Sequence, residues 1–300
     1  MNALFDGTLP DYRENNLDVV VHSKFFKILL EKCHIQNWVE IENEFYKELK
    51  RLLEAGKSID ISNDLNELNI SMQSIIEAMQ LYLSELKCLN EDQRFAEIFM
   101  LPISFDEIPE INQMKYVLPK ETLILNFNYT NTVNRYLKEL VKIPGLSFKV
   151  NNIHGELGNY ENPIVFGFGD ELDEDYKLME KSSTKGFFKY IKSFWYFKTE
   201  NYHNLIRFIQ SDDFQVIILG HSCGLSDRTM LNMIFEHDNC KSIKIYYHQY
   251  SNNDNYTDLT EEISRHFSNK TAMRAKLIPK PLCSRMPQAN PIKNEKLSDN

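Results

Sequence analysis

The sequence TLILNFNYTNTVNRYLKELVKIPGLSFKVNNIHG, residues 122–155, decides the fold. It contains an apolar run, 123–125, and a run of mixed apolar and polar residues, 148–153, and each leads into polar residues. A third run, residues 216–219, ends in the same way at GHSCGLSD, residues 220–227. Runs of this kind separated by helical sequence are typical of parallel strands in an α/β sheet. Ligands bind such sheets at the carboxyl ends of the strands, so we expect a site where these three strands end.

The remaining sequence predicts long helices before this sheet and a continued alternation of strands and helices after it. Apolar residues recur at spacings of three and four over 36–55 and 61–88, which indicates two amphipathic helices. Residues 18–34 also read as a helix, although their valine run is compatible with a short strand. The expected strands are 122–127, 148–153, 164–166, 215–220 and 242–247, and the expected helices between and after them are 130–141, 185–198, 202–211, 227–236 and 258–268.

These elements predict an α/β fold with a Rossmann-like parallel sheet and an inserted or flanking layer of long helices. We expect a mainly helical part over residues 1–120 and an α/β part over 121–276 that shares one core with it. Residues 277–300 contain several prolines and end in polar sequence, which favours a disordered or loosely attached tail.

Composition narrows the class of protein. The 300 residues carry a net charge of −9, which argues against a broad nucleic-acid-binding face. The five cysteines form no CxxC pair, as is usual for reduced thiols in a cytoplasmic protein. No apolar run approaches the ~18 residues of a membrane-spanning helix, and the first residues do not resemble a signal peptide. We therefore expect a cytoplasmic protein with no membrane partner.

Two strand ends carry candidate ligand-binding groups. Asn126 and Asn128 flank Phe127, so in an extended strand both amides would lie on one side and could bind a ribose. The alternative is that they satisfy the backbone of the following loop. His154 could act as a general base, and Gly155 would let a ligand approach the backbone. A single histidine in this position is more often structural.

The third strand end offers a turn with Gly220, Ser222 and Asp227. Its backbone N–H groups could meet a phosphate or a ribose, although a plain tight turn explains the glycines equally well. The spacing is not that of a nucleophile elbow, and no neighbour in the sequence supports Cys223 as a nucleophile. His237, Asp238, Cys240 and His248 match no zinc pattern, so no metal is expected.

Several motifs taken in order resemble the bacteriophage abortive-infection AbiH family of bacteria. The resemblance covers roughly residues 36–268. The motifs are NFNYTNT at 126–132, IHGEL at 153–157 and GHSCGLSD at 220–227, supported by WVEIE at 38–42, FEH at 235–237 and IYY at 245–247.

That family is more remotely similar to sirtuin-like domains of antiviral systems, which bind NAD and in several systems destroy it. The resemblance implies an antiphage protein that binds or hydrolyses NAD or a related nucleotide, with His154 and Asn128 catalytic. It implies that Asn126, Thr130 and Gly155, together with Gly220, Ser222 and Asp227, hold the nucleotide. The alternative is a non-enzymatic sensor or protein-binding module, with other defence proteins or a second copy as partner.

The sequence departs from the family pattern in one respect. Family members open with a strand and a loop of the form Gly-Asn-Gly-Phe-Asp, and this sequence has no such segment. The departure implies weaker binding of a pyrophosphate and a sheet without one central strand. An exposed apolar sheet edge would then favour self-association.

Overall fold

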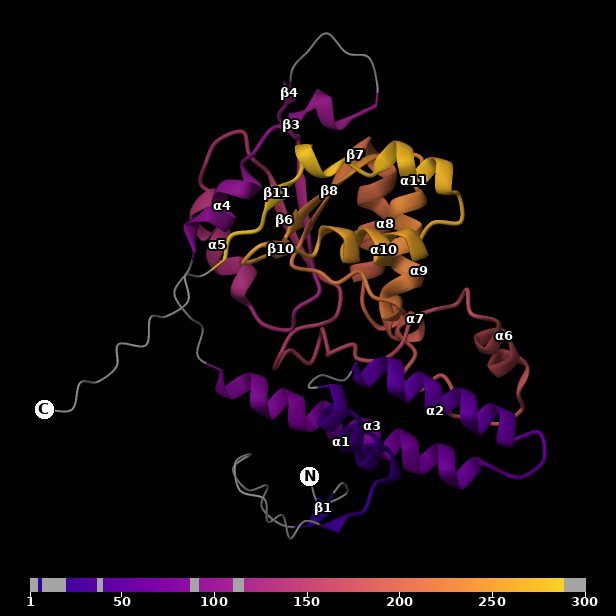
Figure 1. Ribbon diagram of the computed structural model, residues 1–300. Coiled ribbons are helices and arrows are strands. Elements are labelled where there is room, and N and C mark those ends of the chain that lie inside the picture. Colours follow the sequence, from indigo (N-terminus) through magenta and orange to yellow (C-terminus); the bar gives the residue numbers. More distant parts are fainter. Residues whose placement is uncertain (1–4, 7–19, 37–39, 87–91, 110–115, 289–300) are drawn as a thin grey trace, which may run out of the picture.

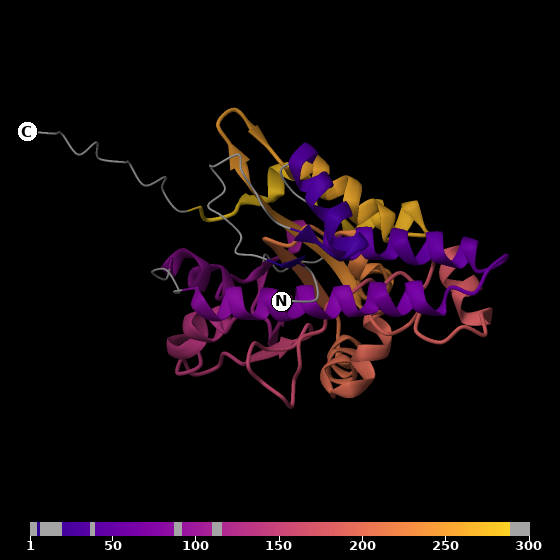
Figure 2. The ribbon, with the colours of Figure 1, turned by 90° about the horizontal axis from the view of Figure 1, so that it is seen from below.

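The computed structural model describes residues 5–6, 20–36, 40–86, 92–109 and 116–288. Three helices form a layer at one end of the molecule: α1 (Lys24–Gln36), α2 (Ile41–Ala55) and α3 (Ser62–Glu85). Figure 1 shows this layer below the α/β part, and Figure 2 shows α2 and α3 running side by side. The amphipathic helices expected over 36–55 and 61–88 are thus confirmed within their described residues. The valine run belongs to the short strand β2 (Val20–Val21), and the helix begins only at Lys24.

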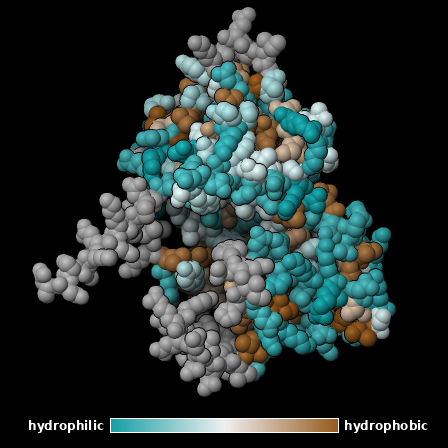
Figure 3. Space-filling view, in the orientation of Figure 1, coloured by the Kyte–Doolittle hydropathy of each residue, from teal (hydrophilic) through white to brown (hydrophobic). Residues whose placement is uncertain are grey.

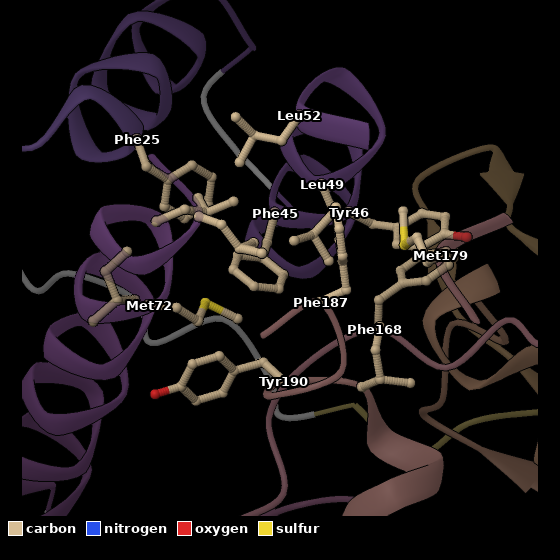
Figure 4. Packing of buried hydrophobic residues seen from close by; sticks show 14 of the residues in the cluster. Phe25, Phe45, Tyr46, Leu49, Leu52, Met72, Phe168, Met179, Phe187 and Tyr190 are labelled. Atoms are coloured by element: carbon tan, nitrogen blue, oxygen red, sulfur yellow. The ribbon is translucent and has the colours of Figure 1, made fainter. Parts of the chain in front are cut away.

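A hydrophobic cluster holds this layer together. Phe45 of α2 lies at its centre with no exposed surface, and its ring meets the edges of Phe25 and Tyr190. Figure 4 shows Phe45 between α1, α3 and the loop that carries Phe187 and Tyr190. The cluster also takes in Phe168, which stacks on Tyr46 with 4.1 Å between ring centroids. The helical layer therefore packs on loops of the α/β part.

The α/β part contains two small parallel sheets. In the first, β5 (Thr122–Asn126) pairs with β6 (Phe148–Asn152), so that Asn126 lies opposite Asn152. In the second, β7 (Phe214–Leu219) pairs with β8 (Cys240–Tyr247), which also pairs with β11 (Ser284–Arg285). The helices α5 (Thr132–Leu140), α8 (Asn201–Ser211), α9 (Arg228–Glu236) and α10 (Tyr256–Arg265) follow or precede these strands. The expected α/β class with parallel strands is confirmed.

The other elements are short and connect the layers. They are β1 (Phe5–Asp6), α4 (Gln93–Phe99), β3 (Ile103–Ser104), η1 (Phe105–Glu107), β4 (Tyr116–Val117), α6 (Glu174–Lys181), α7 (Lys192–Trp195), η2 (Tyr196–Lys198), η3 (Leu225–Asp227), β9 (Gln249–Tyr250), β10 (Asn253–Asp254), α11 (Lys270–Lys276) and η4 (Lys280–Leu282). No helix among the described residues is long and apolar enough to cross a membrane.

A second hydrophobic cluster fills the α/β part. It includes Ile153, Ile218, Phe235, Ile243 and Ile245, which come from the ends or interiors of β6, β7, α9 and β8. The half-buried Trp195 packs against this cluster and against the cluster of the helical layer. The described residues therefore contain two clusters that both contact Trp195. The division of the chain at residue 120 stays a prediction.

Three segments differ from what the sequence indicated. Residues 164–166 form no strand, since Val165 N–H bonds the His154 carbonyl in a turn-like return of the chain. Residues 185–190 are turns, and only α7 and η2 are helical between 185 and 198. Residues 277–288, expected in the loose tail, are packed: Ile278 is 2% exposed and β11 extends the sheet. The end of the expected tail, residues 289–300, lies outside the described residues.

Candidate functional site

The candidate site lies where β6 and β7 end, on the side of the sheets that faces the helical layer (Figure 1). Residues 153–155 follow β6 directly, and Asp227 is the last residue of η3 after β7. His154 Nε2 lies 3.0 Å from Asp227 Oδ1, and both side chains are buried. Two segments that are 73 residues apart in the chain thus supply a histidine–carboxylate pair, which the sequence did not predict as a pair.

Lys192 and Glu42 extend this pair into a buried network. Lys192 Nζ lies 2.8 Å from Asp227 Oδ1 and 3.2 Å from Glu42, and its side chain is 1% exposed. Glu42 belongs to α2 and also accepts a 3.0 Å hydrogen bond from the Gly167 N–H. The network therefore connects the helical layer, through α7, to the strand ends.

Electrostatics keep the network charged. Burial by itself raises the pKa of Asp227, but Lys192 and His154 outweigh burial and hold that pKa well below its usual range. Burial lowers the pKa of Lys192, while Asp227 and Glu42 raise it above its ordinary value. A buried charge is stable only when it is paired in this way, so the carboxylate and the ammonium each depend on the other.

A second histidine faces the same carboxylate. His221 Nε2 lies 3.7 Å from Asp227 Oδ2, and His221 Nδ1 accepts a 2.9 Å hydrogen bond from the Cys223 N–H. This bond leaves the ring proton of a neutral His221 on Nε2, toward Asp227. Burial lowers the pKa of His221 to about 4, so the ring is neutral at pH 7.

The turn after β7 is held in a strained conformation. Gly220 and Cys223 have φ of 72° and 56°, a region that residues other than glycine rarely adopt. The Cys223 carbonyl lies 2.7 Å from His266 Nε2, which fixes the turn from its other side. Burial raises the pKa of the Cys223 thiol to about 12, so the thiol stays protonated and is a poor nucleophile at neutral pH.

Aromatic rings enclose His154. The ring centroid of Phe127 lies 5.1 Å from that of His154, and those of Tyr129 and Tyr196 lie at 6.4 Å and 6.5 Å. The Tyr196 hydroxyl is 3.4 Å from His154 Nε2. Burial raises the pKa of both tyrosines well above the ordinary value, so both hydroxyls keep their protons. Only 4% of His154 is exposed.

Gly155 makes room for the return of the chain after β6. Its φ is +83°, and a Cβ built there would lie 2.1 Å from the Pro163 carbonyl oxygen. Any side chain would therefore displace the segment that follows. The observed close approach is by the chain's own backbone, and the nucleotide-binding role expected for Gly155 stays a prediction.

The other predicted site residues lie in different surroundings and do not form one group around His154. Asn126 is buried and its amide bonds Asn152 and the Asn128 N–H, so it fastens the ends of β5 and β6. Asn128 is exposed beyond the strand, so the two amides do not share one environment. The Thr130 hydroxyl lies 3.1 Å from that of Thr132. Gly220 and Ser222 are exposed on the turn after β7. The catalytic role of Asn128 and the binding roles of the others stay predictions.

Sequence reasoning missed three members of the site: Glu42, Lys192 and His221. Glu42 and His221 lie inside motifs that carry the family resemblance, which is the signal that could have found them. Lys192 follows Ile191 in an aromatic segment and has no such signal. Among the described residues no group of three or more His, Cys, Asp or Glu side chains could hold a metal ion.

The side chains of the site suit a general base with an orienting carboxylate better than they suit the binding of a pyrophosphate. Lys192 already forms ion pairs with two carboxylates, and Arg228 forms one with Asp170 at 3.1 Å. Phosphate oxygens would therefore have to be bound by backbone N–H groups and hydroxyls on the turns, with Ser222 exposed for such a contact.

Comparison with known protein families identifies the family of this chain. The model of a family described as "Bacteriophage abortive infection AbiH" matches residues 10–249. Comparisons with curated proteins and with solved structures gave no match. The matched range takes in α2 and every residue of the network formed by Glu42, His154, Lys192 and Asp227.

Proposed function

This chain belongs to the AbiH family of bacteriophage abortive-infection proteins, and from this membership and its buried site we propose that it is an antiphage effector that binds and hydrolyses NAD or a related nucleotide. In this proposal the two small sheets are parts of a Rossmann-like, sirtuin-like arrangement, and the nucleotide binds where their strands end.

The pairing of His154 with Asp227 carries the proposal. His154 directs Nε2 to the carboxylate, and no described residue hydrogen bonds its Nδ1. A carboxylate on one ring nitrogen fixes the tautomer and leaves the other nitrogen as a base. Nδ1 of His154 is therefore the atom that would take a proton from a ribose hydroxyl or from water.

The reaction needs one water molecule for each NAD. The bond between ribose C1′ and the nicotinamide nitrogen breaks, and its electron pair neutralises the positive charge of the nicotinamide ring. Water forms the new bond to C1′ of the oxocarbenium-like ribose, and its proton passes to His154 Nδ1 and then to solvent. The Asp227 carboxylate stabilises the imidazolium while it exists, as the carboxylates of other histidine pairs do.

A second candidate function is a sensor or protein-binding module without catalysis. The observation that favours it is the burial of the network: His154 is 4% exposed, and Glu42 ties the strand ends to the helical layer. In that case the network would hold the helical layer and the α/β part in one arrangement. A bound partner would act by changing that arrangement.

Isothermal calorimetry and nicotinamide release distinguish the two. We expect the purified full chain to bind NAD and ADP-ribose and to release nicotinamide from NAD. His154→Gln should lower the rate of nicotinamide release by about 10²-fold to 10⁴-fold, the range for loss of a general base. His203→Gln, on the exposed surface of α8, is the matched control and should behave as wild type. Circular dichroism confirms that each variant is folded.

A comparison of the wild type with His154→Gln in infected cells tests the proposed role in antiphage defence. NAD should fall after infection of cells that carry the wild type and stay constant with His154→Gln. A folded wild type that binds no NAD and protects cells whose NAD is unchanged would reject NAD chemistry and favour the sensor.

A further inference from the structure

Residues 181–199 differ from the rest of the chain in charge and composition. Their sequence, KSSTKGFFKYIKSFWYFKT, is rich in lysine and aromatic residues and contains no aspartate or glutamate, although the whole chain carries a net charge of −9. The segment runs from the end of α6 through turns to α7 and η2, where the helical layer meets the α/β part (Figure 1). A basic stretch of this kind in an acidic chain indicates a local surface for anions.

Three lysines of the segment present free positive charge. Lys185, Lys189 and Lys198 are exposed. None of their ammonium groups forms an ion pair with a described carboxylate, whereas the exposed Lys177 pairs with a glutamate. The Lys189 N–H bonds the Gly186 carbonyl, so Lys185 and Lys189 lie at the two ends of one turn. Their charges are therefore available to a negatively charged ligand.

Two aromatic rings are exposed in the same segment. Phe194 of α7 is 45% exposed, and Phe197 of η2 is 87% exposed. The backbone that carries them is fixed from inside, because Trp195 Nε1 donates a 2.7 Å hydrogen bond to the Lys189 carbonyl and Tyr196 is buried. Rings on a fixed backbone lose little conformational freedom when they bind a ligand.

The lysines lie beside these rings. Lys198 Nζ is 3.3 Å from the ring centroid of Trp195, and Lys189 Nζ is 5.4 Å from that of Tyr190. The rings of Tyr190 and Trp195 stack with 6.3 Å between their centroids. Both ammonium groups are thus held against one aromatic pair, next in the chain to the exposed rings.

We propose that this segment binds single-stranded nucleic acid through a basic–aromatic patch that consists of Lys185, Lys189, Phe194, Phe197 and Lys198. The lysines neutralise backbone phosphates, and the exposed rings stack on unpaired bases. Stacking accepts every base, so binding should not depend on the sequence of the strand.

A duplex and a membrane suit the patch less well. A duplex keeps its bases stacked on one another, and α7, with four residues, is too short to lie along a major groove. Insertion into a membrane surface requires a long amphipathic helix with a continuous apolar face. Figure 3 shows hydrophobic residues interspersed with hydrophilic ones on the visible face.

The inner side of the same segment contacts the candidate site. Lys192 Nζ lies 2.8 Å from Asp227, and the Tyr196 hydroxyl lies 3.4 Å from His154 Nε2. A bound strand would therefore rest on the outer side of the residues that hold the buried network. The patch itself shares no residue with that network, so strand binding is independent of the proposed NAD chemistry.

Fluorescence anisotropy of the purified full chain tests the binding. The probe is a labelled oligothymidylate of about 15 nucleotides, the length of one single-strand site, titrated at about 50 to 200 mM salt. The logarithm of the affinity should fall with the logarithm of the salt concentration with a slope of about −2, which corresponds to three phosphate contacts on a single strand. A duplex of the same length should bind at least about tenfold less tightly, because its bases cannot stack on the rings.

Two variants, each with a matched control, localise the binding. Phe197→Ala should weaken it by about 5-fold to 150-fold, the range for one lost base stack, whereas Tyr116→Ala, at a 64% exposed ring on β4, should not. Lys189→Glu should weaken binding and make the salt slope shallower by about 0.7, whereas Lys138→Glu on the exposed surface of α5 should leave both unchanged. Circular dichroism confirms that each variant is folded.

Several results would overturn the proposal. No binding of the oligonucleotide by the folded wild type would reject it, as would wild-type affinity in both Phe197→Ala and Lys189→Glu. Equal affinity for the duplex would reject a single strand as the ligand. Binding to phosphatidylserine vesicles but not to the oligonucleotide, with loss in Phe197→Ala, would replace it by a membrane surface. All of these measurements are made without NAD, so they neither support nor reject the proposed hydrolysis.

Discussion

At the scale of single residues, the titration of His221 has a direct consequence for stability. Its folded-state pKa is about 4, whereas an unfolded histidine has a pKa near ~6.5. At a pH between these two values, His221 is protonated in the unfolded chain and neutral in the folded chain. The contribution of His221 is therefore complete above pH 6.5 and is lost as the pH falls toward 4.

We expect this loss to reach up to about 3 kcal/mol, since each pKa unit corresponds to about 1.4 kcal/mol. Urea unfolding at pH 7.5, 6.5, 5.5 and 4.5 measures it, and His221→Gln should flatten the decline. His203→Gln on the exposed face of α8 is the control and should keep the wild-type slope. Equal slopes in the wild type and His221→Gln would show that the folded chain protonates His221 freely.

The residues of the site could be predicted from sequence only where they stand in a motif at a strand end. His154 and Asp227 were identified in this way, and the structure brings them within hydrogen-bonding distance. Lys192 could not be identified, because its partner Asp227 is 35 residues away and its own segment carries no motif. Contacts between distant segments follow from tertiary packing, which leaves no local pattern.

At the scale of the elements, the packing of α2 determines whether the helical layer forms. Phe45 has no exposed surface and contacts Phe25 and Tyr190 by ring edges. Phe45→Ala should lower the free energy of unfolding by about 3 to 5 kcal/mol, through lost burial and the cavity left behind. Phe197→Ala, at a side chain that is 87% exposed, should change it by less than about 0.5 kcal/mol. A loss below 1 kcal/mol for Phe45→Ala would show that the layer repacks around the gap.

The elements were predicted well where periodicity was strong and poorly where tertiary contacts replaced it. The long helices, the β5–β6 and β7–β8 strands and the helices between them follow the apolar patterns of the sequence. Residues 185–190 carry a helical pattern, yet Phe187 and Tyr190 point into the helical layer from turns. Residues 277–288 looked like a tail because of their prolines, but burial of Ile278 and pairing of β11 hold them in place.

At the scale of the whole molecule, one buried network joins the two hydrophobic clusters. Glu42 comes from α2, Lys192 from α7 and Asp227 from the turn before α9. Trp195, three residues after Lys192, packs against both clusters. The helical layer and the α/β part should therefore unfold together, with Trp fluorescence and circular dichroism giving coincident transitions.

Asp227→Asn tests this coupling. It leaves the Lys192 ammonium buried beside one carboxylate instead of two, so we expect a loss of about 3 to 5 kcal/mol in urea unfolding, as for other broken buried pairs. Lys192→Met should cost a similar amount, and the double variant should cost clearly less than the sum, because both charges of the Lys192–Asp227 pair are then absent and only Glu42 loses its partner. The exposed Glu54, which pairs with Lys57, supplies the matched control Glu54→Gln, for which little change is expected. Additive losses, or separate transitions for the two probes in the wild type, would mean that the network does not couple the layers.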